Sequence, residues 1–324
     1  MKRIPLWIPI RSLGAINVYA FYRNRNNGVS LVDAGMLSGR SILDLAWGLK
    51  GLGFNLCDVE KVVLTHFHVD HSSLLALLLS CDVEVYMGRR DVEVVKGGVR
   101  NFVEAATNLY LQHGTPVEEV EAMLSNHPAL KLEYAYDRVR EADIQGLGDG
   151  DTITLGGKRL EVIEAPGHTP GSILLYSRGT RELFTGDTLL PGITPHVTIH
   201  DPGSDPLGEY LESLERISSI EARIAYPGHR EPLEDPRIRA LELIRHHQER
   251  LSEIEELVRT LEPVTAYEVA KRVRWRTRYS SWSMYPPQEK FFAMGETLAH
   301  LRRLEVEGRV AKGLEDGIYY WRPA

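Results

Sequence analysis

The segment Thr65-His66-Phe67-His68-Val69-Asp70-His71 constrains this chain most, because it places four metal-ligand side chains directly after an apolar run typical of a buried strand. Side chains of a strand alternate between its two faces, so His66 and His68 share one side and can bind one ion. Asp70 continues that alternation and His71 does not. If the chain turns into a helix here, Asp70 and His71 swing toward a second ion. The segment therefore predicts a metal centre.

Three later segments place a further ligand in the same kind of position, a loop with glycine that leaves a strand. They are Pro166-Gly167-His168, Gly186-Asp187-Thr188 and Pro227-Gly228-His229. Binding side chains are commonly carried on such loops, and the glycines allow tight turns. Scattered surface histidines would explain one such segment but not four together. Imidazole and carboxylate ligands indicate zinc, with manganese or iron as alternatives.

The elements around these segments predict an α/β core with two sheets. The two hairpin turns are expected at Asn26-Asn27-Gly28 and Gly156-Gly157. The start of the chain is interrupted by prolines and is expected to form a strand rather than a signal peptide. Helices are expected over 41–52 and 72–79, and strands over 16–23, 29–33, 62–65, 152–155, 159–164, 172–176 and 181–185. The region 89–140, with helices over 99–112 and 117–124, breaks this alternation and predicts an insertion that covers a site.

The last ninety residues are expected to be mostly helical. Helices over 235–261, 265–273 and 289–307, followed by a hairpin over 310–321, give the element order of a winged helix. From Val264 to the end, eleven Lys and Arg stand against seven Asp and Glu, a net charge of +4. In an extended strand, Arg274, Arg276 and Arg278 would share one face, with Val273, Trp275 and Thr277 on the other. A solvated basic rim explains them better than a nucleic-acid surface, which stays an open alternative.

Composition excludes several classes of protein. A hydrophobic fraction of 43% with 26% charged residues is typical of a globular chain, and no apolar run is long enough to span a membrane. The net charge of -7 argues against attraction to nucleic acid or anionic lipid by the molecule as a whole. Cys57 and Cys81 are expected to be unpaired, buried thiols. Two free thiols favour a reducing compartment, and we therefore expect a cytoplasmic protein.

The order HxHxDH, then H, D and H, resembles the pattern of the metallo-β-lactamase-fold hydrolase superfamily over residues from about 12 to 232. Within it, the chain is similar to the glyoxalase II and lactamase-like-protein-2 type with a C-terminal winged-helix module. The resemblance implies a four-layer αββα sandwich over 1–232, a connecting helix over 233–262 and a small winged-helix domain over 263–324. It assigns His66, His68 and His168 to a first metal, Asp70, His71 and His229 to a second, and Asp187 to both. Asp33 matches a structural position beside the ligands.

Such a site predicts hydrolysis. Two zinc ions, Asp70, Asp187 and a bridging hydroxide leave a charge of about +1, which favours a small anionic substrate. The metal-bridging hydroxide would attack an ester or thioester, and Asp70 would orient it. His196 follows Asp187 in a loop rich in proline and glycine, and is a second catalytic candidate. Tyr110 and Arg100 of the insertion are candidates for the wall of a substrate pocket.

Two other functions remain open from the sequence. One is a metal-dependent endoribonuclease or phosphodiesterase that holds nucleic acid with the winged helix. The other is a mononuclear iron oxygenase of the persulfide type, which shares many of these ligands. A homodimer is also left open. The remaining histidines are expected to pack or to lie on helix surfaces; they are His113, His127, His200, His246, His247 and His300.

Overall fold

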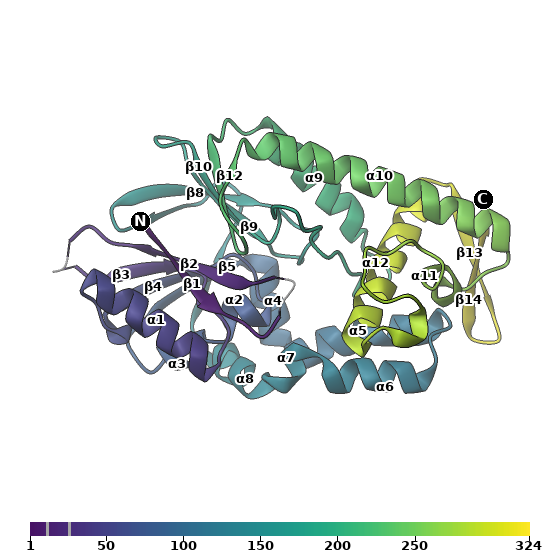
Figure 1. Cartoon of the computed structure of the whole chain (residues 1–324), viewed down its shortest axis with the longest axis horizontal. Coiled ribbons are helices and arrows are strands. Elements are labelled where there is room, and N and C mark those ends of the chain that lie inside the picture. The colour runs from purple at the N-terminus through teal and green to yellow at the C-terminus, as the bar shows by residue number, and fades with distance from the viewer. Residues whose placement is uncertain (11–12, 25–26) are drawn as a thin grey trace.

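The computed structural model describes residues 1–10, 13–24 and 27–324. It contains two six-stranded sheets, which pack face to face (Figure 1). The first sheet has the order β1-β2-β3-β4-β5-β6 and the second has the order β12-β11-β10-β9-β8-β7. The strands of the first sheet are β1 (Lys2–Trp7), β2 (Ala15–Phe21), β3 (Val29–Val32), β4 (Val59–Leu64), β5 (Glu84–Gly88) and β6 (Ile144–Leu147). Those of the second are β7 (Thr152–Leu155), β8 (Lys158–Glu164), β9 (Ile173–Ser177), β10 (Glu182–Gly186), β11 (Ile224–Pro227) and β12 (Leu233–Glu234).

The central strands of both sheets, such as β3 and β9, are buried on both faces, as continuous apolar strands require. Tyr19 of β2 and Val63 of β4 meet Phe184 of β10 in the core between the sheets. Their neighbours Val18 and Val62 point the other way, into a core shared with the helices. Helix α1 (Gly39–Leu52) packs on the first sheet, while α9 (Pro206–Ser219) lies on the outer side of the second. The predicted αββα sandwich is confirmed.

Several expected elements differ in detail. The helix expected over 72–79 is two single turns, α2 (Val69–Ser72) and α3 (Leu75–Leu78). The Ser72 and Ser73 hydroxyls hydrogen-bond to backbone carbonyls of the preceding turn, at Phe67, His68 and Val69, which competes with a regular helix. Strands β2 and β3 pair as the predicted hairpin, although Asn26 of its turn lies outside the described residues. Strands β5, β6, β11 and β12 and helix α9 were not predicted.

The insertion contains five helices rather than the two predicted. They are α4 (Arg89–Gly97), α5 (Val99–Gln112), α6 (Val117–Asn126), α7 (Pro128–Lys131) and α8 (Glu133–Glu141). Glu119 of α6 accepts hydrogen bonds from Tyr267, Trp282 and Lys290 in the C-terminal part of the chain. These bonds join the insertion to the C-terminal part, so it is not a free flap.

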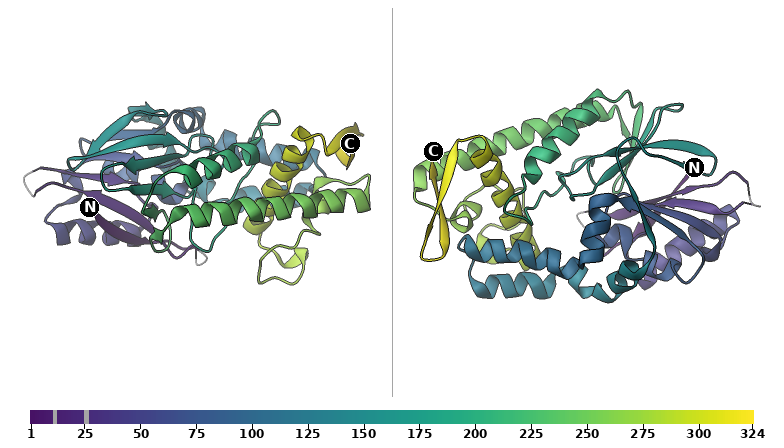
Figure 2. Two further views of the ribbon diagram at one scale, coloured as in Figure 1. Left: turned by 90° about the horizontal axis from the view of Figure 1, so that it is seen from above. Right: turned by 180° about the vertical axis from the view of Figure 1, so that it is seen from behind.

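The C-terminal part extends away from the sandwich, and the two chain termini lie toward opposite ends of the long axis (Figures 1 and 2). Its elements are α10 (Pro236–Leu261), α11 (Ala266–Ala270), a 3₁₀ turn (Trp282–Met284), α12 (Pro287–Val306), β13 (Val310–Glu315) and β14 (Ile318–Pro323). The order of helices and hairpin is the expected one, and the assignment to a winged helix stays a prediction. The segment from Arg274 to Arg278 is not a strand, yet its three arginines are exposed while Trp275 turns inward beneath Arg250.

The expectation of two free cysteines is wrong. Cys57 and Cys81 form a disulfide, with their Cα atoms 5.3 Å apart. A 3₁₀ turn (Leu56–Asp58) after α1 brings Cys57 beside the chain that leaves α3, and Cys57 is exposed rather than buried. The two cysteines therefore do not support a reducing compartment. Among the described residues, no helix is both long and apolar enough to cross a membrane.

Candidate metal centre

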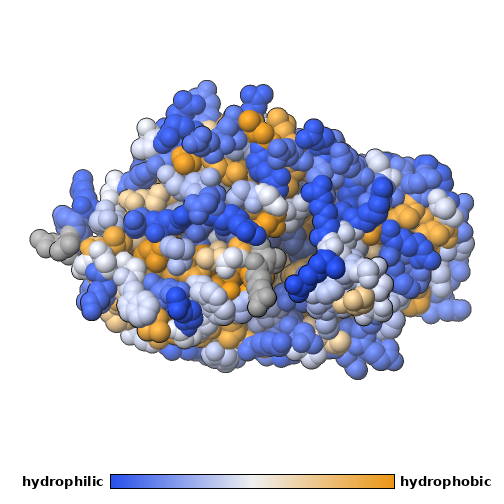
Figure 3. Space-filling model, in the orientation of Figure 1, coloured by the Kyte–Doolittle hydropathy of each residue, from blue (hydrophilic) through white to orange (hydrophobic). Residues whose placement is uncertain are grey.

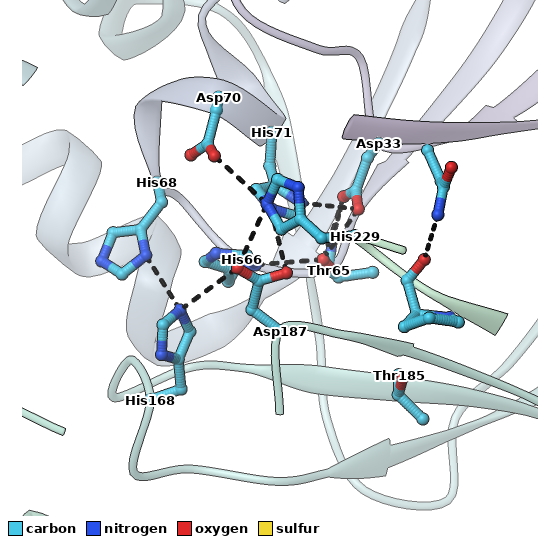
Figure 4. Close-up of polar contacts among 12 residues, drawn as sticks. Asp33, Thr65, His66, His68, Asp70, His71, His168, Thr185, Asp187 and His229 are labelled. Atoms are coloured by element: carbon cyan, nitrogen blue, oxygen red, sulfur yellow. Dashed lines mark hydrogen bonds and ion pairs between the residues drawn. The ribbon is translucent and has the colours of Figure 1, made fainter. Parts of the chain in front are cut away.

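The seven predicted ligands meet at one edge of the sandwich (Figure 4). His66 and His68 follow β4, and Asp70 and His71 lie in α2. The other three, His168, Asp187 and His229, stand in loops that follow β8, β10 and β11. Strands β3 and β4 are parallel, as are β10 and β11, so their carboxyl ends lie at the same edge of each sheet. Strand direction thus brings distant segments of sequence together.

His66, His68 and His168 form the first of two ligand groups, with one ligand atom from each within 4.8 Å of the others. His68 Nδ1 and His168 Nε2 are 3.0 Å apart. Two nitrogens that each lie about 2.0 Å from one tetrahedral zinc are about 3.3 Å apart. The separation in the structure therefore fits shared coordination of one ion.

Asp70, His71 and His229 form the second group, in which His229 Nε2 lies 3.3 Å from Asp70 Oδ2. Asp187 stands between the groups. Its Oδ1 is 3.3 Å from His71 Nε2, and its Oδ2 is 3.5 Å from His229 Nε2 and 4.0 Å from His168 Nε2. One carboxylate thus faces ligands of both groups.

Several ligand atoms in this centre are buried without any hydrogen-bond partner among the described residues. They are His66 Nε2, His71 Nε2, Asp187 Oδ1 and His229 Nε2. A buried polar atom without a partner costs about 1 to 3 kcal/mol, so four in one place need an explanation. Metal ions would satisfy all four, and the residues therefore fit a metal centre.

Backbone carbonyls and Asp33 orient the rings. His168 Nδ1 donates to the carbonyl of His196, and His229 Nδ1 donates to that of Ala15, each at 2.8 Å. A carbonyl can only accept, so in the neutral rings Nε2 keeps its lone pair for a metal. His71 Nδ1 lies 2.8 Å from Asp33 Oδ2. Asp33 also accepts from the backbone and side chain of Thr65, which links the strand end to the site.

The electrostatics of the centre favour bound cations. Burial lowers the pKa of His66, His68 and His168, so these rings are neutral, as metal ligands must be. Although burial opposes it, His229 and His71 lower the pKa of Asp70 to about 2. Against the effect of burial, Asp187 and Asp33 raise the pKa of His71 well above its usual value. The carboxylates of this edge therefore attract positive charge, from protons or from metal ions.

Asp91 is a positioning residue that the sequence did not reveal. Its buried carboxylate accepts hydrogen bonds from Phe67 N at 3.0 Å, from Thr169 Oγ1 at 2.8 Å and from Gly171 N at 2.6 Å. It therefore ties the segment of His66 and His68 to the loop of His168. The only signal in the sequence is an aspartate shortly after a strand, which also describes many surface turns.

The other predicted site residues have more limited contacts. His196 holds His168 through its carbonyl, while its ring contacts Thr198 and Phe292. Tyr110 is fully buried beside Phe291. Arg100 pairs with Glu133 at the rim of a cavity of about 210 Å³ between helices of the insertion, and none of the seven ligands lines this cavity. A catalytic role for the His196 side chain stays a prediction.

An αββα sandwich with metal-ligating side chains gathered at one edge is typical of one class of metal-binding hydrolases. Residues 11–229 match the model of the Metallo-beta-lactamase superfamily. The chain belongs to this superfamily and is a hydrolase.

The similarity to known proteins covers different shares of the chain. The probable metallo-hydrolase YqjP of Bacillus subtilis is 27% identical over 95% of this chain and 94% of its own. The acyl-coenzyme A thioesterase MBLAC2 of Bos taurus is 27% identical over 61% of this chain and 63% of its own. The crystal structure of the metallo-beta-lactamase family protein TTHA1429 from Thermus thermophilus superposes with a TM-score of 0.81 and 31% identity, covering 100% of this chain and 98% of that one. The C-terminal helices and hairpin are thus part of the shared architecture.

Proposed function

We propose that the protein is a dinuclear zinc hydrolase that cleaves small anionic esters or thioesters. The observation that carries the proposal is the position of Asp187, which faces ligands of both groups at 3.3 to 4.0 Å. Such a carboxylate suits two ions side by side better than one. When bound, two zinc ions supply an ionised water at neutral pH and polarise the substrate carbonyl.

The charge of the site selects the substrate. Asp70 and Asp187 are ionised, so two divalent ions and a hydroxide leave about one positive charge. A substrate with a carboxylate or phosphate near its reacting carbonyl is therefore attracted. The similarity to a protein named acyl-coenzyme A thioesterase supports a thioester within this class.

Asp70 is the candidate for handling the proton. It remains ionised at neutral pH because His229 and His71 stabilise its charge. An ionised carboxylate at this position accepts a hydrogen bond from the attacking water and can take up its proton. The leaving thiolate or alkoxide then requires a proton, which Asp70 can return.

The C-terminal part borders the centre and can contact the rest of the substrate. The ring of His196, whose carbonyl holds His168, contacts Phe292 of α12 at 4.6 Å between centroids. Figure 3 shows the surface hollowed between the sandwich and the C-terminal part. Residues of α12 are therefore well placed to contact a substrate in the centre.

The test combines metal content with a substrate panel. Zinc and iron would be measured by mass spectrometry, and acyl thioesters, phosphodiesters and single-stranded RNA would be assayed with wild type and His68→Ala. His200→Ala is the matched control, because His200 is equally half-buried but is not a ligand. We expect two zinc ions and a thioesterase activity that His68→Ala loses and His200→Ala retains.

Two results would replace this proposal. A single iron ion with oxygen uptake would indicate the persulfide-type oxygenase. RNA cleavage that weakens in the double variant Arg274→Ala and Arg276→Ala would indicate an endoribonuclease instead.

A further inference from the structure

A second cluster of buried histidines lies outside the seven ligands, between α10 and α12. His246, His247 and Glu296 each offer a ligand atom, and these atoms lie within 4.8 Å of one another. The cluster is separated from the metal centre by Tyr210, whose ring contacts His247 at 5.5 Å between centroids and whose hydroxyl donates to the carbonyl of Thr188. It is therefore a distinct group of side chains, one aromatic ring away from the Asp187 loop.

A chain of hydrogen bonds fixes the tautomer of His247. His300 Nδ1 donates to the carbonyl of Glu296 at 2.7 Å, since a carbonyl can only accept. In neutral His300, Nε2 then carries the lone pair and accepts from His247 Nδ1 at 3.2 Å. The lone pair of His247 consequently resides on Nε2. That atom is buried and has no hydrogen-bond partner among the described residues.

This arrangement is the one expected behind a metal-binding histidine, which donates its other ring N–H to an oriented acceptor. Glu296 supplies the charge that an ion needs. Its side chain is 14% exposed, and within the described chain its carboxylate accepts no hydrogen bond; its nearest cation is Arg250 Nη1, at 4.0 Å. Arg250 is itself paired with Glu253, at 3.3 Å. Arg250 thus compensates little of the Glu296 charge, and burial raises the pKa of Glu296 to about 7 although Arg250 lowers it, so a bound cation would stabilise the ionised carboxylate.

His246 is the third member of the cluster and lies on the side that solvent can reach. It is half-buried, and burial together with Arg250 and Arg276 lowers its pKa, which favours the neutral ring that a metal requires. Because His246 and Glu296 both retain some exposure, an ion has a path into the cluster from solvent.

We propose that His246, His247 and Glu296 bind a divalent zinc ion that is separate from the metal centre. Two imidazoles and one carboxylate form a recognised zinc ligand set that leaves a position for water. The ion would join α10 to α12, the helix that borders the centre. A packing cluster without an ion would leave the buried Nε2 of His247 without a partner, at a cost that an ion removes.

The test counts zinc in the full-length protein. Purified wild type would be stripped with chelator, reloaded with excess zinc, desalted, and analysed by mass spectrometry beside Glu296→Gln and His246→Asn. Each variant is expected to bind one zinc per chain fewer than wild type. Glu289→Gln, an exposed change on the same helix, is the matched control and should bind as much as wild type.

Cobalt would provide a second readout, because its visible absorption reports on the ligands. Titration of wild type should show one more saturable absorption step than titration of Glu296→Gln, whatever the number of ions in the centre. This difference distinguishes the proposal from that of a dinuclear centre, whose ions depend on His68 and not on Glu296.

Equal zinc content and equal cobalt spectra in wild type and His246→Asn would overturn the proposal. If Glu296→Gln fails to fold, His246→Asn still decides, because His246 is only half-buried and its replacement leaves the buried contact between His247 and His300 in place.

Discussion

Two regions of the molecule, the metal centre and the His246/His247/Glu296 cluster, contain the same kinds of side chain, histidines and carboxylates. They differ in how many carboxylates lie close to the histidines. At the edge, carboxylates raise the pKa of His229 to about 10 although burial lowers it. In the cluster, burial dominates and lowers the pKa of His247 well below its usual value. Buried histidines are neutral in both regions except where carboxylates lie very close to the ring, as Asp70 and Asp187 do at His229, at 3.3 and 3.5 Å. The metal centre, with more carboxylates, should therefore attract cations more strongly than the cluster.

Because Asp187 faces both ligand groups, we expect metal binding and activity at the metal centre to depend on Asp187 above all. Asp187→Asn keeps the shape of the side chain and removes the charge that faces both ligand groups. We expect hydrolytic activity to fall by more than about 100-fold, since even partners outside the ligands cost 10- to 100-fold. Activity and zinc content would be measured beside Asp201→Asn, an exposed control. Unchanged zinc content in Asp187→Asn would show that the charge of Asp187 does not hold the ions of the metal centre.

Asp33 should matter less, because it acts through His71. Asp33→Asn removes the anion that orients and polarises His71 Nδ1 at 2.8 Å. We expect zinc affinity at the edge to fall about 10- to 100-fold, with the cluster unaffected. Competition with a chelating dye would measure both affinities. A loss of less than threefold would show that backbone contacts alone orient the ring.

Histidines that are neutral because of burial should make the C-terminal part sensitive to acid. Burial and Lys312 lower the pKa of His113 to about 3, and its Nδ1 accepts from Trp321 Nε1. The pKa of His113 is therefore lower in the folded than in the unfolded state. Its contribution to the free energy of unfolding is complete above about pH 6.5 and is lost as the pH falls toward 3, by up to about 1.4 kcal/mol per pH unit.

His113→Asn keeps an acceptor for Trp321 and removes the titration. Its unfolding free energy, measured in urea between pH 4 and 7, should therefore fall less steeply with acid than that of wild type. Parallel curves for the two proteins would exclude His113 as a source of the acid sensitivity.

The smallest effect is expected on the exposed basic segment. Arg276 forms no ion pair with any residue that the structure describes, so Arg276→Ala should change stability by less than about 0.5 kcal/mol and leave thioester hydrolysis unchanged. Thermal unfolding and the thioester assay would check both values. A loss of activity would place this segment in contact with the substrate.

Much of the fold was accessible from the sequence because its signals are local. Runs of apolar residues predicted β2, β4 and β10, and glycine-containing loops after such runs indicated where His168, Asp187 and His229 lie. Strand β11 escaped prediction because its four residues end in Pro227, and proline argues against a strand. The two turns around Ser72 escaped it because an apolar run does not show where a helix is interrupted. Helices α4 and α8 of the insertion, nine residues each, were missed because charged residues fill more than half of their positions and few apolar residues mark a buried face.

The sequence by itself determined which residues could bind metal, since ligand type, spacing and the alternation of a strand are properties of neighbouring residues. Only the tertiary structure decided which distant residues meet. Asp91 joins two ligand loops, Cys57 pairs with Cys81, and Glu296 on α12 lies beside His247 on α10. Such contacts depend on how layers and helices pack, and periodicity reports only that a face is buried, not what lies opposite it.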